Sequence, residues 1–214
     1  MKQAGGLLTN VDNMTLTPIR TDGKSYTAVA GSTGQPVTVS RFNADGTPDA
    51  GFPRVTIGPT GAIMRVVATI PMADGSVVVA TGGINPGNTA LQLSTLTSIS
   101  DSGQILRTLT AAQSTLPSGG QTLKLIGQAP DGKFLLAGST IAEPNTPMLV
   151  KRYNTDLTPD TTFNRTGTLS IDTLQVPPSG IASLNDGGIQ IVFQDRQGVY
   201  SAVNIDNGGN VLTT

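Results

Sequence analysis

Short apolar runs alternate with turn-forming residues along this chain of 214 residues. Four of the runs begin shortly after an Asp-Gly pair, and they are Tyr26–Ala30, Val77–Ala80, Phe134–Ala137 and Ile189–Phe193. A partly apolar stretch also precedes each pair. Two such stretches joined by a short Asp-Gly turn predict a β-hairpin, because glycine tolerates the positive φ that these turns need.

The Asp-Gly pairs are evenly spaced, which indicates an internal repeat. They begin at positions 22, 74, 131 and 186, so the intervals are 52, 57 and 55 residues. A second segment repeats too, since residues 36–52 and 147–163 are identical at nine of seventeen aligned positions. Shorter Asx-Gly turns in residues 100–104 and 205–209 take its place in the other two units. This self-similarity favours a repeat architecture over a β-sandwich with coincidental turns.

Each unit is predicted to run strand, Asp-Gly turn, strand, loop, strand, Asp turn, strand. Four antiparallel strands in about 55 residues are the size of one propeller blade. We therefore predict an all-β, β-propeller-like fold in a single domain, residues 1–214, with about four four-stranded antiparallel blades. The blades are expected at approximately 13–63, 64–122, 123–179 and 180–214. Because alternate units share their second turn, the chain looks like a duplicated two-blade unit.

Residues 1–12 are predicted to form an extra strand that closes the ring or serves as an assembly arm. Residues 5–9, Gly-Gly-Leu-Leu-Thr, resemble residues 209–213, Gly-Asn-Val-Leu-Thr. An open sheet edge invites pairing with another chain. Either this piece closes a four-bladed ring within one chain, or it pairs with a neighbouring subunit.

The composition supports a sheet protein and narrows the chemistry. Thirty Thr, 26 Gly and 14 Pro favour strands and turns, and one Glu beside thirteen Asp argues against helices. The chain has no His and no Cys, which removes imidazole proton transfer, disulfides and thiolate metal ligands. With a net charge of −1 and no basic run, we expect no nucleic-acid partner. No apolar run is long enough to cross a bilayer, so no membrane partner is expected.

Three segments of the third unit resemble a known family. Residues 130–138, Pro-Asp-Gly-Lys-Phe-Leu-Leu-Ala-Gly, together with residues 151–154 and 158–163, resemble the bacterial delta-60 repeat, a blade-forming motif of β-propeller-like proteins. The first unit also matches it well, whereas the second and fourth lack the Arg-Tyr-Asn and Thr-Pro-Asp signatures. The resemblance implies the fold, and it brings no common catalytic site.

The repeated segment contains the candidate site residues, which are Arg41, Asp45 and Asp49 and their equivalents Arg152, Asp156 and Asp160. The arginines are expected either to face a ligand in the ring or to lie at blade junctions and pair with Asp. The carboxyl pairs could suggest glycoside hydrolysis or a Ca²⁺ loop. However, each pair recurs in two units, as structural turns do, and no Glu closes a Ca²⁺ loop. We therefore expect no catalytic residue, metal or cofactor, with Ca²⁺ the only cofactor left open.

By elimination, the sequence predicts that the chain is not an enzyme. Its low-charge, Thr- and Gly-rich composition favours a structural or assembly module that acts through protein–protein contacts in a homo- or hetero-oligomer. The concrete form expected is a bacteriophage virion protein, tail or capsid-associated, found in the virion or in the cytoplasm of the producing cell. The alternative is an extracellular recognition module that binds a glycan or cell-surface ligand, from a secreted delta-60 repeat protein.

Overall fold

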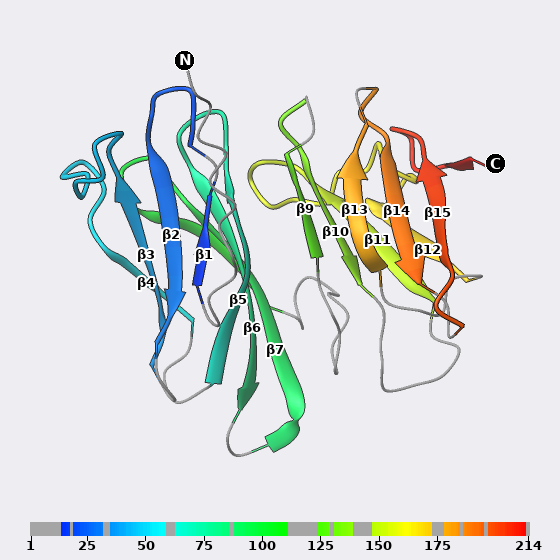
Figure 1. Ribbon diagram of the computed structural model, residues 1–214, viewed down its shortest axis with the longest axis horizontal. Coiled ribbons are helices and arrows are strands. Elements are labelled where there is room, and N and C mark those ends of the chain that lie inside the picture. Colours follow the sequence, from blue (N-terminus) through cyan, green and yellow to red (C-terminus); the bar gives the residue numbers. More distant parts are fainter. Residues whose placement is uncertain are drawn as a thin grey trace.

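The computed structural model contains four antiparallel sheets of four strands each (Figure 1). It describes residues 14–17, 19–31, 35–58, 63–85, 88–110, 124–128, 131–138, 147–172, 178–184, 186–194 and 197–212. Within these ranges no helix is long and apolar enough to cross a membrane. The predicted all-β fold with four four-stranded blades is confirmed.

Each sheet is one blade made of four consecutive strands. Blade 1 comprises β1 (Met14–Leu16), β2 (Ser25–Ala30), β3 (Val37–Phe42) and β4 (Val55–Ile57). Blade 2 comprises β5 (Ile63–Pro71), β6 (Val77–Asn85), β7 (Asn88–Ile99) and β8 (Ile105–Thr110). Blade 3 comprises β9 (Lys124–Gln128), β10 (Phe134–Gly138), β11 (Met148–Tyr153) and β12 (Thr168–Ile171). Blade 4 comprises β13 (Pro178–Ser183), β14 (Ile189–Gln194), β15 (Tyr200–Ile205) and β16 (Val211–Leu212).

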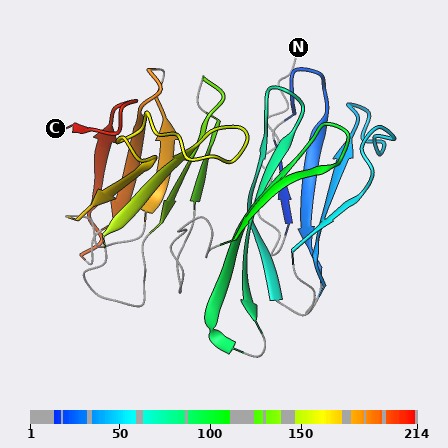
Figure 2. The ribbon, with the colours of Figure 1, turned by 180° about the vertical axis from the view of Figure 1, so that it is seen from behind.

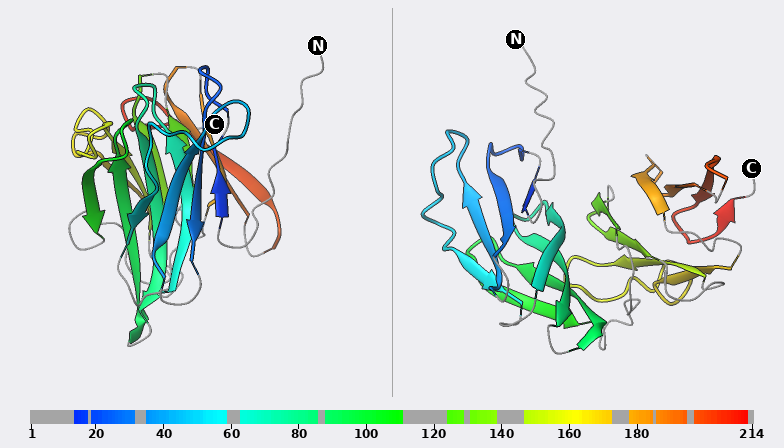
Figure 3. Two further views of the ribbon diagram at one scale, coloured as in Figure 1. Left: turned by 90° about the vertical axis from the view of Figure 1, so that its left-hand side faces the viewer. Right: turned by 60° about the horizontal axis from the view of Figure 1, so that its bottom comes forward.

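The blades follow one another along an open arc, with blade 1 and blade 4 at its two ends (Figure 3). The first strands of consecutive blades are neighbours, because β1 contacts β5, β5 contacts β9, and β9 contacts β13. Blade 2 has the longest strands, and Figure 2 shows them reaching past the neighbouring blades. The arm expected to close the ring, residues 1–12, lies outside the described residues.

The hydrophobic core is divided among the three junctions between consecutive blades. One apolar cluster joins blade 1 to blade 2, a second joins blade 2 to blade 3, and a third joins blade 3 to blade 4. The inner blades are covered on both faces, so β6 is buried continuously over Val77–Ala80 and β10 over Phe134–Ala137. In the end blades, β2 and β14 alternate buried and more exposed positions, as expected for a strand covered on one face.

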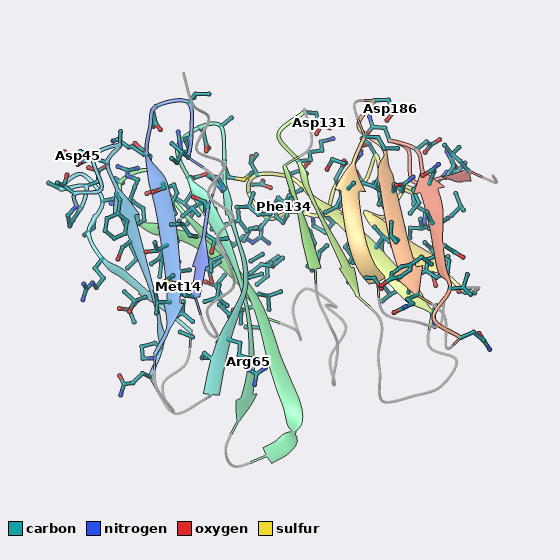
Figure 4. All side chains as sticks on the ribbon, in the orientation of Figure 1. Met14, Asp45, Arg65, Asp131, Phe134 and Asp186 are labelled. Carbon is teal, nitrogen blue, oxygen red and sulfur yellow. The ribbon has the colours of Figure 1, made fainter. Side chains whose placement is uncertain are left out.

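The two hairpin turns of every blade lie at the same end of the array. Figure 4 labels three of these turns, at Asp45, Asp131 and Asp186, along that end. The arrangement follows from the four-stranded meander, in which the first and third turns fall on the same side. The Asp-rich turns of neighbouring blades are thereby brought next to one another.

Candidate functional site

Arg41 is buried at the junction between blades 1 and 2. Its Nε donates to Oδ2 of Asp49 at 2.7 Å, and its Nη1 donates to the Tyr26 hydroxyl oxygen at 3.2 Å. The same Nη1 also bonds Asp101, in the turn between β7 and β8 of the next blade. A second cation, the Nζ of Lys24, lies 2.8 Å from Oδ2 of Asp49. Arg41 therefore connects two blades with its own donors.

Arg152 repeats this arrangement at the junction between blades 3 and 4. Its Nε donates to Asp160, and its Nη2 donates to Oγ1 of Thr162 at 3.2 Å. Its Nη1 bonds Asn207, in the turn between β15 and β16 of the next blade. The Nζ of Lys133 lies 3.1 Å from Oδ2 of Asp160, as Lys24 does beside Asp49.

An aromatic ring lies against each guanidinium group. The guanidinium carbon of Arg41 is 5.0 Å from the ring centroid of Phe52, and that of Arg152 is 5.1 Å from the ring centroid of Phe163. Both distances fall within the range of a cation–π contact. Arg41 and Arg152 are only 3% and 2% exposed, so both guanidinium groups are buried within the protein.

The paired carboxyl groups are strongly acidic. The pKa of Asp49 is lowered to about 2 by hydrogen bonds from Lys24 and the Gly51 amide and by Arg41. Burial alone would raise the pKa of Asp160, but hydrogen bonds from Thr162, Lys133 and Arg152 lower it to about 2. Both groups are therefore ionised at neutral pH and held by cations.

Asp45 and Asp156 have a different role, since each caps its own turn. The Oδ1 of Asp45 accepts the Thr47 amide at 2.9 Å and the Thr47 hydroxyl at 2.7 Å. Asp156 accepts the same two groups of Thr158. These hydrogen bonds lower the pKa of each carboxyl group. A glycosidic general acid works with a raised pKa, whereas the pKa of Asp45 and the pKa of Asp156 are lowered.

The Ca²⁺ loop considered from the sequence has no ligand set in the described part of the chain. Within those ranges there is no group of three or more His, Cys, Asp or Glu side chains that could hold a metal ion. Asp49 is paired with Arg41 and Lys24, while Asp45 faces the backbone of its own turn.

The junction between blades 2 and 3 has no arginine at the equivalent position. Tyr26 pairs with Arg41 and Leu135 with Arg152, and the corresponding pair in blade 2 is Val78 with Ser98. The Ser98 hydroxyl is buried without a hydrogen-bond partner. The Tyr153 hydroxyl of blade 3 is in the same state, and burial raises its pKa to about 12.

Leu157 contributes apolar contact at this junction instead. It is fully buried in the cluster between blades 2 and 3, and Phe134, also in that cluster, is seen between the two blades in Figure 4. Leu157 has a φ of 65°, at a turn position where the other three blades have glycine. That backbone costs roughly 1–2 kcal/mol, and burying a leucine side chain contributes about 1.5–3 kcal/mol, so the exchange favours the junction.

The outward face of blade 4 is a feature that the sequence interpretation missed. Its residues point away from blade 3, whereas Ile189, Ile191 and Ile205 of the same strands are buried against blade 3. We define this blade 4 outer face by three cross-strand pairs, Gln190 with Asn204, Val192 with Ala202, and Gln194 with Tyr200.

Amide groups and one aromatic ring dominate the blade 4 outer face. Tyr200 is 65% exposed, the only aromatic side chain among the described residues with a largely exposed ring. The Nε2 of Gln190 donates to Oδ1 of Asn204 at 3.0 Å. In blade 2, the positions of Gln190 and Ala202 are held by the buried Val78 and Leu96. The polar alternation Ile-Gln-Ile-Val-Phe-Gln in β14 was the sequence signal for this face.

Comparisons with known proteins agree with the propeller fold. Residues 22–52 and 129–163 match a family model described as a domain of unknown function (DUF5122), β-propeller. These stretches include the segments that resemble the delta-60 repeat. No curated protein matches the chain.

Solved structures of similar fold include glycoside hydrolases. A thermostable family-43 glycoside hydrolase has a TM-score of 0.50 and 7% identity, with 94% of this chain and 71% of that chain covered. An α-L-arabinanase of Penicillium chrysogenum has a TM-score of 0.48 and 11% identity, with 92% and 65% covered. An α-L-arabinofuranosidase from Lactobacillus brevis has a TM-score of 0.46 and 13% identity, with 89% and 66% covered. At 7% identity, the likeness to the thermostable family-43 glycoside hydrolase shows a shared fold alone.

This comparison corrects two predictions made from the sequence. The prediction of a non-enzymatic structural or assembly module of a bacteriophage virion is wrong, and so is the plain exclusion of an enzyme, because the chain shares its fold with a family-43 glycoside hydrolase. The exclusion rested on the missing histidine and on the interpretation of the repeated carboxyl pairs as structural turns, whereas glycoside hydrolysis uses carboxyl groups and needs no imidazole. The alternative prediction of glycan recognition fits the comparison better.

Proposed function

We propose that this chain is a carbohydrate-recognition module and that its ligand binds the blade 4 outer face. The exposed ring of Tyr200 beside the amides of Gln194, Gln190 and Asn204 is the observation that carries the proposal. The fold shared with a family-43 glycoside hydrolase supports it. The proposal goes with the extracellular location given above as the alternative.

The chemistry of the face suits a sugar ring. A sugar presents an apolar C–H face and a rim of hydroxyl groups, and an aromatic ring packs on the former while amides bond the latter. The bond from Gln190 to Asn204 fixes both amides and leaves the Gln190 carbonyl oxygen and the Asn204 amino group for a ligand. The Nε2 of Gln194 is likewise held, by the Gly198 carbonyl oxygen at 3.0 Å.

A merely solvated cap explains the exposed ring less well. Burial of a tyrosine ring is favourable, so an exposed one on a flat sheet face loses that contribution unless a partner covers it. Charged or small polar residues would solvate an end blade without this loss. Blade 1, at the other end of the array, presents Thr27, Thr38 and Ser40 beside the aliphatic Val29 on its outward face.

The test is glycan binding by the full chain. It is first screened on an array of neutral and acidic oligosaccharides, and the best ligand is titrated by calorimetry. Tyr200→Ala is expected to weaken binding about tenfold, and Tyr200→Phe to retain it, because the ring supplies the stacking surface. Leu106→Ala is the matched control, since Leu106 is 61% exposed on β8 of blade 2, away from the site.

Two results would contradict the proposal. One is that the chain binds no glycan on the array. The other is that Tyr200→Ala binds the titrated glycan as tightly as the unchanged chain does. The urea midpoint of each variant is measured as a control and is expected to match that of the unchanged chain, because the substituted positions are exposed. Release of reducing sugar is measured on the same ligands, because the comparison structures are glycoside hydrolases. Sugar release that needs Tyr200 would extend the proposal from binding to cleavage.

A further inference from the structure

The blade 4 outer face is longer than a single sugar ring. Tyr200 lies at one end of β15 and Asn204 is four residues further along the same strand. At about 3.3 Å per residue, their Cα atoms are roughly 13 Å apart. A monosaccharide stacked on Tyr200 therefore cannot reach the amide pair formed by Gln190 and Asn204.

The surface between these two ends is low and apolar. Val192 and Ala202 pair across the strands midway between the Tyr200 end and the Asn204 end. Ala202 is exposed and Val192 is half-buried. Neither side chain carries a polar group or is large enough to divide the face, so an extended ligand can lie along the strands over both of them.

The blade 4 outer face has no charged side chain. None of its six residues is an Asp, Glu, Lys or Arg. Among the described residues in the turns just before β14 and just after β15, the charged ones are Asp186 and Asp206. Asp186 caps its turn through the Gly188 amide, and Asp206 accepts both the amide and the side chain of Asn210. Two acidic groups would repel an anionic sugar.

We infer that the ligand is an uncharged oligosaccharide of at least three sugar units, lying along β14 and β15 with one ring on Tyr200 and a distal unit bonded by Gln190 and Asn204. This inference rests on the proposed function and adds the length, the charge and the orientation of the ligand. The Asn204 amino group and the Gln190 carbonyl oxygen act as positioning groups for the distal unit, whereas Tyr200 holds the first.

The experiment is a chain-length series. Mono-, di-, tri- and tetrasaccharides of the neutral cello-, xylo-, manno- and arabino-type are titrated into the full chain by calorimetry. Affinity is expected to rise about tenfold or more from the monosaccharide to the trisaccharide and then to level off. Between about 20 mM and about 500 mM NaCl the affinity is expected to change less than twofold, because none of the six residues of the face is charged.

Two variants separate the ends of the face. Asn204→Ala is expected to lower trisaccharide affinity to near the monosaccharide level and to leave monosaccharide binding unchanged. Tyr200→Ala is expected to weaken every member of the series. Ser201→Ala is the control, because Ser201 is exposed on the same strand but points to the opposite face.

The outcomes distinguish this inference from the proposed function. Equal affinity for mono- and trisaccharide, full trisaccharide binding by Asn204→Ala, or a ligand that is acidic and salt-sensitive would overturn the inference while Tyr200-dependent recognition stands. Absence of binding throughout the series and on the array would overturn both.

Discussion

The junctions within each pair of blades differ from the junction between the pairs. Blades 1 and 2, and blades 3 and 4, are joined by a buried arginine that reaches a turn of the following blade. Blades 2 and 3 are joined by apolar packing, with Ser98 where the arginine would stand. The difference shows that neighbouring blades of one repeat architecture can be joined in two ways, by a buried polar network or by additional apolar contact.

The polar mechanism has a cost that the apolar mechanism avoids. The free energy needed to desolvate two charges offsets much of their attraction, so a buried ion pair adds little net stability. Removal of one partner is nevertheless strongly destabilising, because it leaves the other charge buried and unpaired. Each arginine does, however, hold several partners in one geometry. Arg41 bonds Tyr26 and Asp49 of its own blade and a turn of the next. Arg152 bonds the loop of Asp160 and Thr162 and a turn of the next blade. Leu157 only fills space, and it tolerates an unfavourable backbone to do so.

The largest expected effect is that of Arg152→Met. The substitution leaves Lys133 as the one cation among the described residues that pairs with the buried carboxylate of Asp160, which keeps its hydrogen bonds from Thr162, and it removes the link to Asn207. We expect a loss of roughly 4 kcal/mol in the free energy of unfolding, measured with urea. Arg41→Met should cost less, because the carboxyl group that it leaves, that of Asp49, is 9% exposed, against 3% for Asp160. A loss below about 1 kcal/mol for Arg152→Met would show that the network is not what holds blades 3 and 4 together.

Leu96→Ala tests the apolar junction. Leu96 is fully buried between blades 2 and 3, so its truncation is expected to cost about 3 kcal/mol. Because no charge is involved, the loss should be the same at low and high salt. A loss that shrinks strongly with added salt would contradict the assignment of this junction to apolar packing.

A further prediction concerns the dependence of stability on acidic pH. The pKa of Asp49 and of Asp160 is lowered to about 2 in the folded chain, from an ordinary value of 3.8. Their contribution is therefore present above about pH 4 and is lost as the pH falls toward about 2. The double variant Asp49→Asn with Asp160→Asn should be less stable near neutral pH and should lose less stability over that range.

Leu96→Ala is the control for the pH experiment, because it should keep the full acid dependence of the unchanged chain. Urea midpoints at several pH values between about 2 and about 5 provide the measurement. If the double Asn variant keeps the same slope as the unchanged chain, other carboxyl groups carry the acid dependence.

The fold could be predicted from the sequence because it depends on local sequence features that recur in every blade. Asp-Gly turns and period-two apolar runs are short-range features, and their recurrence in four copies indicated a blade repeat. The sequence left two positions open for Arg41 and Arg152, one facing a ligand in the ring and one at a blade junction. The structure was needed to locate their side chains at the junctions. A ligand role for these residues and their Asp partners stays a prediction.

The blade 4 outer face could not be predicted because exposure depends on position in the array. Gln190 and Asn204 lie where the inner blade 2 has Val78 and Ser98, and only the end of the array leaves that face uncovered. The alternation in β14 was visible, but one amphipathic strand does not reveal whether its polar side meets solvent, a ligand or another chain. Function was misjudged for a related reason, since it had been argued from missing residue types and not from a surface.

The reach of each arginine into the following blade also sets an order of events during synthesis. Arg41 is separated by 60 residues from Asp101, and Arg152 by 55 residues from Asn207. The first network is therefore able to form once the turn after β7 has emerged from the ribosome. The second network needs the turn after β15, so it can form only later, when nearly all of the described chain has emerged. The contacts that join blades 1 and 2 are thus available to the growing chain before those that join blades 3 and 4.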